Sequence, residues 1–256
     1  MGTINLTVPQ HYGEMTEKQV RYVAALQVAG MPEETIWLKC FTRFAGIKPL
    51  CQLKERYYFI KKGIKLPFSL QIDEINYFVK QISWLTQNYS GIAPVHISTK
   101  YFPCDKLLRD TVFVQYLDAE NFYQAYLHTK QPIFLYKLMA TLYQRKGEYN
   151  NDISQRQIRK FSRASEEEKL LVIMWMTGIK SYFARKFKYL FEHVSEDDVN
   201  DETPPDMYAI IQNQIRMLTD GDITKRSQVL NSNTWNALEE MNQKAKEAKL
   251  MAKQNS

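Results

Sequence analysis

The chain has one concentrated basic segment in which aromatic residues are interleaved with cations. The cations are Arg156, Arg159, Lys160, Arg163, Arg185, Lys186 and Lys188. Such cations can bind a phosphate backbone while rings such as Phe161 and Phe187 stack on bases. The same cations can equally lie on a solvated loop and at a helix C-terminus, where positive charge is favoured. We favour this second interpretation and keep an anionic partner at this patch as the alternative.

Cysteine and histidine, the usual nucleophiles and metal ligands, are few and widely spaced. They are Cys40, Cys51, Cys104, His11, His96, His128 and His193. Zinc sites need close ligand pairs such as C-x₂-C, and none is present. A nucleophile pair of Cys104 with His128 stays open as a minor alternative, because nothing near Cys104 in the sequence would activate a thiolate. Free cysteines favour a reducing compartment.

Sequence motifs for enzymatic chemistry are also absent. The chain has no G-x-x-x-x-G-K-[ST] phosphate loop, no G-x-G-x-x-G dinucleotide motif and no G-x-S-x-G nucleophile elbow. The acidic residues of Asp220-Gly221-Asp222 resemble part of a calcium loop, but the other ligands of an EF-hand are missing, so a turn is preferred. We therefore expect a non-enzymatic protein with no catalytic, metal-binding or cofactor-binding residues.

The C-terminal segment carries the candidate residues for subunit contact. Trp235, Leu238 and Met241 form a narrow apolar stripe at helical spacing. Beyond Lys244 the helix is almost entirely polar, and an isolated helix of this kind is only marginally stable. Such a tail can reach a neighbouring subunit or simply fray. The candidate contact residues are Arg216, Asp222, Trp235, Leu238 and Met241.

The elements that must position these residues are mainly α-helices. Glycine and proline number nine each among 256 residues, and 45% of the residues are hydrophobic, which favours long helices around a core. The predicted helices cover residues 16–30, 32–46, 69–85, 112–128, 132–144, 166–191 and 207–218, a segment capped by Thr224, and a last helix from about 234. A strand at 4–8 and a hairpin near 57–66 form a small β element. The predicted fold is a mainly α-helical bundle with an extended C-terminal helical tail.

The composition also predicts the domain boundaries. Residues 194–206 contain six acidic residues, no basic residue and Pro204-Pro205, which is typical of a linker. We therefore expect a core domain at 1–193, a linker at 194–206 and a C-terminal helical segment at 207–256, with a further linker or ordered loop at 147–162. No apolar stretch is long enough to span a bilayer and no secretory signal is visible, so we expect a soluble protein.

Several segments resemble an uncharacterised protein family of tailed phages and prophages of gut bacteria. The segments are INLTVP (4–9), TEKQ (16–19), NFYQAYL (121–127), FARKF (183–187), QIRMLTDGDITK (214–225) and TWNALEE (234–240). The resemblance implies a structural or assembly role near the head–tail junction or tail, as a connector, ring or tail subunit. It also implies that the partners are other copies of the chain and portal, connector or tail proteins, in the virion or in the host cytoplasm during assembly.

Two other functions stay open. A tail-assembly chaperone or other morphogenesis factor would share these sequence features and be absent from mature virions. A nucleic-acid-binding module would use the basic region at 156–188, with binding that weakens steeply with salt.

Overall fold

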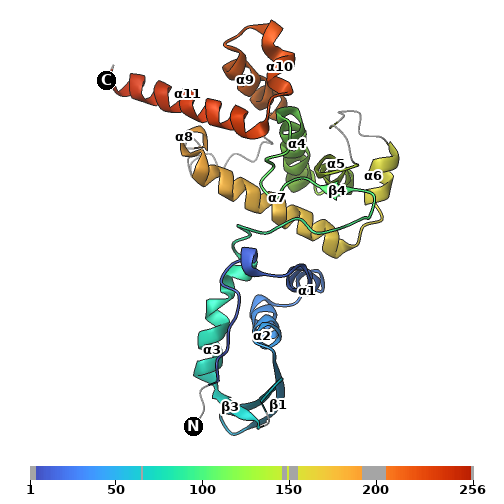
Figure 1. Cartoon of the computed structure of the whole chain (residues 1–256), viewed down its shortest axis with the longest axis vertical. Helices are drawn as coiled ribbons and strands as arrows, with labels where there is room; N and C mark the ends of the chain where they lie inside the picture. The colour runs from blue at the N-terminus through green and yellow to red at the C-terminus, as the bar shows by residue number, and fades with distance from the viewer. Residues whose placement is uncertain (1–3, 65, 146–148, 150–154, 192–205, 255–256) are drawn as a thin grey trace. The chain divides into compact units, whose positions relative to one another are not determined.

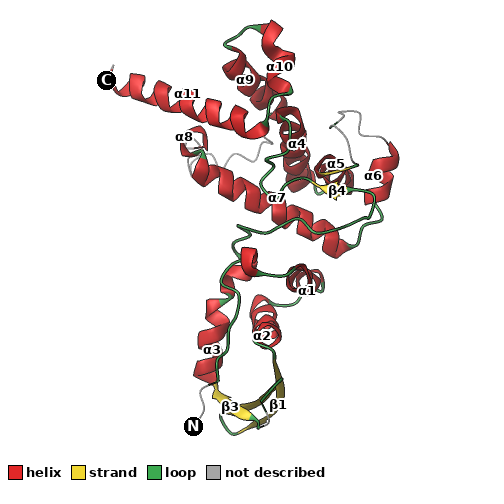
Figure 2. Cartoon of the chain, viewed as in Figure 1, coloured by secondary structure: helices red, strands yellow, loops and turns green. Residues whose placement is uncertain are grey.

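The computed structural model describes residues 4–64, 66–145, 149, 155–191 and 206–254 (Figure 1). It is mainly helical with a small antiparallel sheet (Figure 2), as predicted, whereas the bundle arrangement stays a prediction. The chain forms two compact units, each assembled from separate stretches of sequence. Unit 1 comprises residues 1–93 and 166–178, and unit 2 comprises residues 94–165 and 179–256. Helix α7 (Glu166–Lys186) therefore contributes to both units.

The two units differ from the predicted division, which placed residues 1–193 in one core domain. The predicted linker at 194–206 lies, apart from Asp206, outside the described residues. Its role as a linker therefore stays a prediction.

Unit 1 begins with two helices whose ends match the local sequence signals. Helix α1 (Glu17–Val28) starts with the predicted capping box, in which the Gln19 backbone N–H donates to Thr16 Oγ1 at 3.3 Å and the Thr16 N–H donates to Gln19 Oε1 at 2.8 Å. Helix α2 (Glu33–Phe44) ends before Gly46, which has a φ of +66°. That backbone conformation favours glycine and terminates the helix where expected.

A three-stranded antiparallel sheet follows, in the order β1 (Ile47–Leu53), β2 (Arg56–Lys61) and β3 (Phe68–Gln71). The hairpin predicted near 57–66 is therefore partly wrong, because β2 pairs with residues 68–71. Sequence reasoning missed β1 altogether. Its pattern is interrupted by Pro49, where the pairing with β2 shifts register.

The predicted N-terminal strand at 4–8 is wrong. Residues 4–9 belong to no strand, although they alternate apolar and polar side chains. A strand needs a neighbour to complete its hydrogen bonds, and period-two alternation does not supply one. The carbonyl of Asn5 instead accepts a hydrogen bond from Lys61 Nζ at 2.6 Å.

Helix α3 (Ile72–Gln81) starts later than predicted. Ser69, expected to cap this helix, lies in β3 opposite Tyr58. The cap is Gln71, whose N–H donates to Glu74 Oε2 at 2.7 Å. A short 3₁₀ helix, η2 (Ser83–Thr86), follows.

The first part of α7 completes the core of unit 1. The largest fully buried side chains of this unit are Tyr12, Ile36, Phe41, Ile82, Leu85 and Trp175. Gly178 of α7 lies so close to the loop after η2 that an added Cβ would be 2.3 Å from the Tyr89 carbonyl oxygen. Only glycine permits this approach of the helix to the loop. The expectation that the 166–191 helix is central to a core is thus confirmed for its apolar middle.

Unit 2 contains most of the remaining helices. Its elements are β4 (Phe102–Pro103), α4 (Phe113–Thr129), α5 (Pro132–Leu142), β5 (Tyr143–Gln144), α6 (Gln155–Phe161), α8 (Lys188–Phe191), α9 (Met207–Thr219), η4 (Ile223–Lys225), α10 (Arg226–Leu230) and α11 (Thr234–Gln254). The starts of α4, α5, α9 and α11 and the ends of α4 and α9 follow the predicted pattern closely. Helix α5, predicted to run to residue 144, ends at Leu142, because Tyr143 and Gln144 form β5.

Two further helix predictions need correction. Residues 155–161 of the segment predicted as linker or loop form α6, whose Ile158 and Phe161 are buried one turn apart. The helix predicted to run to about residue 191 ends at Lys186, and the buried Phe187 separates it from α8.

Candidate interaction surfaces

Trp235, at the start of α11, lies among aromatic rings of unit 2. Its ring centroid is 6.1 Å from that of Tyr182, 5.9 Å from that of Phe183 and 5.7 Å from that of Phe187. Its indole N–H donates to the Leu107 carbonyl oxygen at 2.8 Å. Both the apolar ring and the polar nitrogen are therefore satisfied within the chain.

Backbone and side-chain hydrogen bonds join the start of α11 to residues 107–113, and we call this connection the C-terminal clasp. The Oγ1 atoms of Thr111 and Thr234 are 2.7 Å apart, and both residues are buried. The Thr234 N–H donates to the Thr111 carbonyl at 3.0 Å, and the Phe113 N–H donates to the Ser232 carbonyl at 2.8 Å. The start of α11 is therefore part of the unit 2 core.

The apolar residues predicted for subunit contact point into this core. Leu238 and Met241 have no exposed surface, and Trp235 is only partly exposed. In this conformation they contact their own chain. Their role as subunit contacts stays a prediction, and it would require α11 to leave the clasp.

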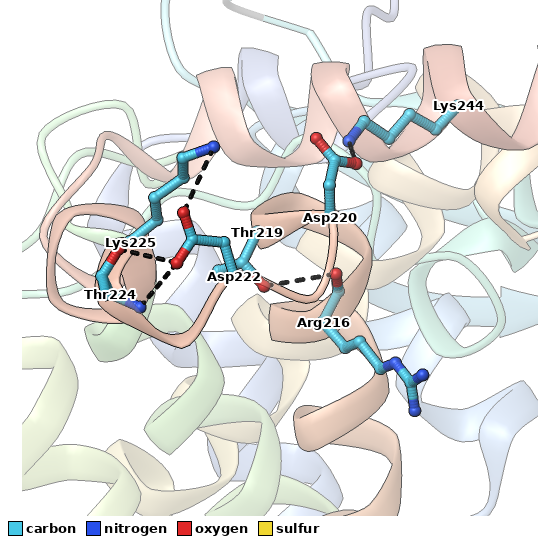
Figure 3. Close-up of polar contacts among 7 residues, drawn as sticks. All are labelled: Arg216, Thr219, Asp220, Asp222, Thr224, Lys225 and Lys244. Atoms are coloured by element: carbon cyan, nitrogen blue, oxygen red, sulfur yellow. Dashed lines mark hydrogen bonds and ion pairs between the residues drawn. The ribbon is translucent and has the colours of Figure 1, made fainter.

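Arg216 and Asp222, the other two candidate contact residues, lie around the turn between α9 and α10 (Figure 3). Arg216 is exposed, and its carbonyl accepts a hydrogen bond from Thr219 Oγ1 at 3.3 Å. Asp222 accepts hydrogen bonds from the Thr224 N–H at 2.9 Å and from Thr224 Oγ1 at 2.6 Å, and these bonds lower the pKa of its carboxyl group. The cap of η4 is thus Asp222, where Thr224 was expected.

This arrangement supports the interpretation of the Asp220–Asp222 segment as a turn. Asp220 has a φ of 53° and Gly221 a φ of 81°, which reverse the chain. Lys244 of α11 donates from Nζ to Asp220 Oδ1 at 2.5 Å and to the Met217 carbonyl at 2.9 Å (Figure 3). The lysine therefore satisfies a carbonyl at the C-terminal end of α9 and lowers the pKa of Asp220. Within the described residues, no group of three or more His, Cys, Asp or Glu could hold a metal ion.

The predicted anionic-partner patch is divided into two groups by α7. The first group consists of Arg159 and Lys160 in α6 and Arg163 shortly after it. The second group consists of Arg185 and Lys186 at the end of α7 and Lys188 at the start of α8. All six side chains are exposed. The side chain of Arg156 lies outside the described residues. Because the 21 residues of α7 rise about 30 Å, the two groups do not form one small site.

The rings expected to stack on bases are mostly unavailable. Phe161 and Phe183 are fully buried and Phe187 is almost so, while Tyr182 is only partly exposed. Phe161 packs against Tyr101 and Tyr143 in the core of unit 2. The nucleic-acid hypothesis for this segment therefore loses the stacking contacts on which it depended.

A different basic surface lies between α8 and α11. Figure 1 shows α11 passing α8, and the side chain of Asn242 joins them by accepting hydrogen bonds from the N–H groups of Tyr189 at 3.0 Å and Leu190 at 3.3 Å. A groove of about 270 Å³ results, which we call the α8–α11 groove. It is lined by Lys188, Tyr189, Lys246, Lys249, Leu250 and Lys253. Sequence reasoning missed it because its two sides are far apart in the chain.

Cys104 lies at a larger cavity of unit 2, of about 610 Å³, which is also lined by Asp110, Gln115, Arg145 and Tyr149. Burial raises the pKa of its thiol to about 12, so the neutral thiol predominates at neutral pH. Its Sγ accepts a hydrogen bond from Gln115 Nε2 at 3.2 Å. This arrangement does not activate a nucleophile.

The open alternative of a Cys104–His128 pair is not supported by the positions of the two residues. Gln115 is in the first turn of α4, beside Cys104, whereas His128 is in the last turn. The helix rises about 20 Å between them. The hydrogen bond to Cys104 comes from an amide, which is not a general base.

Strands β1 and β2 of unit 1 are largely exposed to solvent. In strands β1 and β2 only Ile47 and Phe59 are buried. Leu50 is 50% exposed, Leu53 59% and Ile60 36%. We call these three residues the open sheet surface. The sequence did not indicate that these apolar side chains would be exposed.

A groove between α2 and α3 adds further exposed apolar area to unit 1. Its volume is about 650 Å³, and its lining includes Leu38, Ile72 and Tyr77, each more than 40% exposed. Glu34 and Asp73 also line it. This α2–α3 groove thus combines apolar side chains with negative charge.

In comparisons with known proteins, no family model, no curated protein and no solved structure matches the chain. None of the helices among the described residues is both long and apolar enough to cross a lipid bilayer.

Proposed function

We propose that this chain is a non-enzymatic assembly subunit that binds other protein subunits through unit 1. The observation that carries the proposal is the open sheet surface of Leu50, Leu53 and Ile60. Single exposed apolar side chains are ordinary, but here Leu50 and Leu53 lie on the edge strand β1 and Ile60 on the neighbouring strand β2, and exposed apolar area on one sheet is a feature of interaction sites. Strand β1 is also an edge strand, whose free backbone groups can pair with a strand of another molecule.

The partner that we propose is a second copy of the chain. Among its described residues, the sheet region carries five cations and one carboxylate, namely Lys48, Lys54, Arg56, Lys61, Lys62 and Glu55. The α2–α3 groove carries Glu34 and Asp73 among apolar residues, with Lys80 as a cation. The sheet of one copy and the groove of another are thus complementary in charge and in apolar character. Contact between two different surfaces generates rings when the rotation closes.

The biological setting of the proposal comes from the resemblance to the phage family. That resemblance implies a subunit of a head–tail connector, ring or tail assembly, with portal or tail proteins as further partners. The alternative is a tail-assembly chaperone, which would bind transiently and be absent from mature particles. Mass spectrometry of purified particles separates the two, because only a structural subunit is retained at constant stoichiometry.

Light scattering coupled to gel filtration, over a wide range of protein concentration, tests self-association. We expect the full chain to form oligomers and the double variant Leu50→Ser, Leu53→Ser to be monomeric. The matched control is Leu250→Ser, Met251→Ser, which removes two similarly exposed apolar side chains from α11. It should keep the oligomeric state of the unmodified chain. A chain that is monomeric at every concentration, or a sheet variant that still assembles, would refute the proposal.

A further inference from the structure

The α8–α11 groove is a strongly basic concave surface formed by described residues of α8 and α11. We propose that it binds the phosphate backbone of duplex DNA without reading base sequence. Four of its six lining residues are lysines, and none is acidic. This site differs from the predicted patch, with which it shares only Lys188.

The spacing of the lysines on α11 suits a row of phosphates. Lys246, Lys249 and Lys253 lie on one face of the helix at steps of three and four residues. The rise from Lys246 to Lys253 is about 10 Å. Successive phosphates of one DNA strand are about 3.4 Å apart along the axis, so these lysines span roughly three phosphates. Lys188 provides the opposite wall from α8.

Contacts of Asn242 and Tyr189 help to hold the groove in shape. Asn242 fixes the start of α8 through the N–H groups of Tyr189 and Leu190. The Tyr189 ring lies 4.9 Å from Lys188 Nζ and 5.9 Å from Lys246 Nζ. The ring therefore gathers two ammonium groups at the base of the groove. Contacts of this kind at exposed sites are weak and do not prevent a phosphate from binding.

The chemistry of the groove favours nucleic acid over a lipid surface. Leu250 is its one aliphatic lining residue, whereas a helix that lies in a membrane needs a broad apolar face. Lysine is a point charge that binds phosphate without directional readout. We therefore expect binding that depends on backbone charge and not on sequence.

Fluorescence anisotropy of a labelled short DNA duplex, titrated with the full chain at several salt concentrations, tests the proposal. The full chain is required because the sequence after α8, at 192–202, is strongly acidic and could oppose binding. With four lysine contacts, we expect a slope of log affinity against log salt of about −3.6. The triple variant Lys246→Gln, Lys249→Gln, Lys253→Gln should reduce the slope by about 3 and weaken binding about ten-fold or more at low salt.

The matched control removes the same charge from the predicted patch. The variant Arg159→Gln, Lys160→Gln, Arg163→Gln should keep the slope of the unmodified chain. Circular dichroism melting curves establish that both variants are folded. Three outcomes overturn the proposal: no binding of the duplex by the unmodified chain, equal loss in both triple variants, or binding of phosphatidylserine vesicles in place of the duplex. Gel filtration of the same variants keeps this test separate from that of self-association.

Discussion

The start of α11 in unit 2 and the sheet in unit 1 both carry apolar side chains next to polar ones, but they differ in how far those apolar side chains are buried. Leu238 and Met241 of α11 are completely buried, whereas Leu50 and Leu53 of β1 are at least half exposed. The apolar stripe that looked available for a partner is used internally. Strand β1, which was not predicted from the sequence, has apolar residues exposed to solvent.

This difference shows what an apolar stripe does and does not reveal. Its spacing indicates that the residues need a covering surface, but not which molecule supplies it. For α11 the apolar cover of Trp235 comes from the rings of Tyr182, Phe183 and Phe187, and the clasp joins the start of the helix to residues 107–113, more than a hundred positions earlier. For β1 the described part of the chain provides little cover, and that is why unit 1 carries our proposal for assembly.

The largest expected effect on stability comes from a substitution at the buried start of α11. Trp235→Ala should lower the free energy of unfolding by about 3 kcal/mol, because it removes a packed ring from the core of unit 2. Urea denaturation measures the change. Tyr208→Ala is the control, since Tyr208 is 74% exposed on α9 of the same unit, and it should change stability by no more than about 0.5 kcal/mol. Equal effects would mean that α11 is not anchored by Trp235.

A smaller loss should follow from the buried hydroxyl pair of the clasp. Thr234→Val removes the Oγ1 contact with Thr111 and should cost about 1 kcal/mol of unfolding free energy. A double-mutant cycle with Thr111→Val isolates the interaction, and we expect a coupling energy of about 1 kcal/mol. Strictly additive single variants would show that the two hydroxyls do not interact in solution.

A substitution in the open sheet surface should change the stability of the monomer very little. Leu53→Ser should change the unfolding free energy of the monomer by no more than about 0.5 kcal/mol, because the side chain is 59% exposed. The measurement is made under dilute conditions, where self-association does not contribute. A loss comparable to that of Trp235→Ala would mean that the sheet is covered, and the contrast between the regions would disappear.

The smallest effect concerns the turn after α9. The hydrogen bond from Lys244 lowers the pKa of Asp220 below its ordinary value. A carboxyl group with a lowered folded-state pKa stabilises the fold above its unfolded-state pKa, and that contribution is lost as the pH falls through the folded-state pKa. NMR titration of the Asp220 carboxyl should therefore show a pKa that returns toward the ordinary range in Lys244→Gln. An unchanged pKa would place Lys244 elsewhere in solution.

Sequence reasoning predicted those parts of the fold that depend on neighbouring residues. The capping box at Thr16, the glycine after α2, the break at Pro132 and the start of α11 are local signals, and each was found where expected. The strand at 4–8 failed because alternation cannot supply a pairing partner. Strand β1 was missed because Pro49 obscured its pattern.

The candidate surfaces were less predictable, because each depends on segments that are distant in the sequence. Lys188 and Lys253 could be joined in one groove only when α8 was placed against α11. The exposure of Leu53 depends on the absence of a covering element, which spacing does not report. The burial of Phe161 and Phe183 likewise follows from tertiary packing, and it changed the interpretation of the basic segment.

The shared helix α7 has a consequence for the order in which the protein is made. Unit 1 is interrupted by residues 94–165, so its last piece, which includes the buried Trp175, is translated well after residues 1–93. At about 5–20 residues per second, the ribosome needs several seconds to synthesise the intervening stretch. During that interval the N-terminal segment lacks the helix that completes its core. A nascent chain of this kind is suited to early capture by a chaperone.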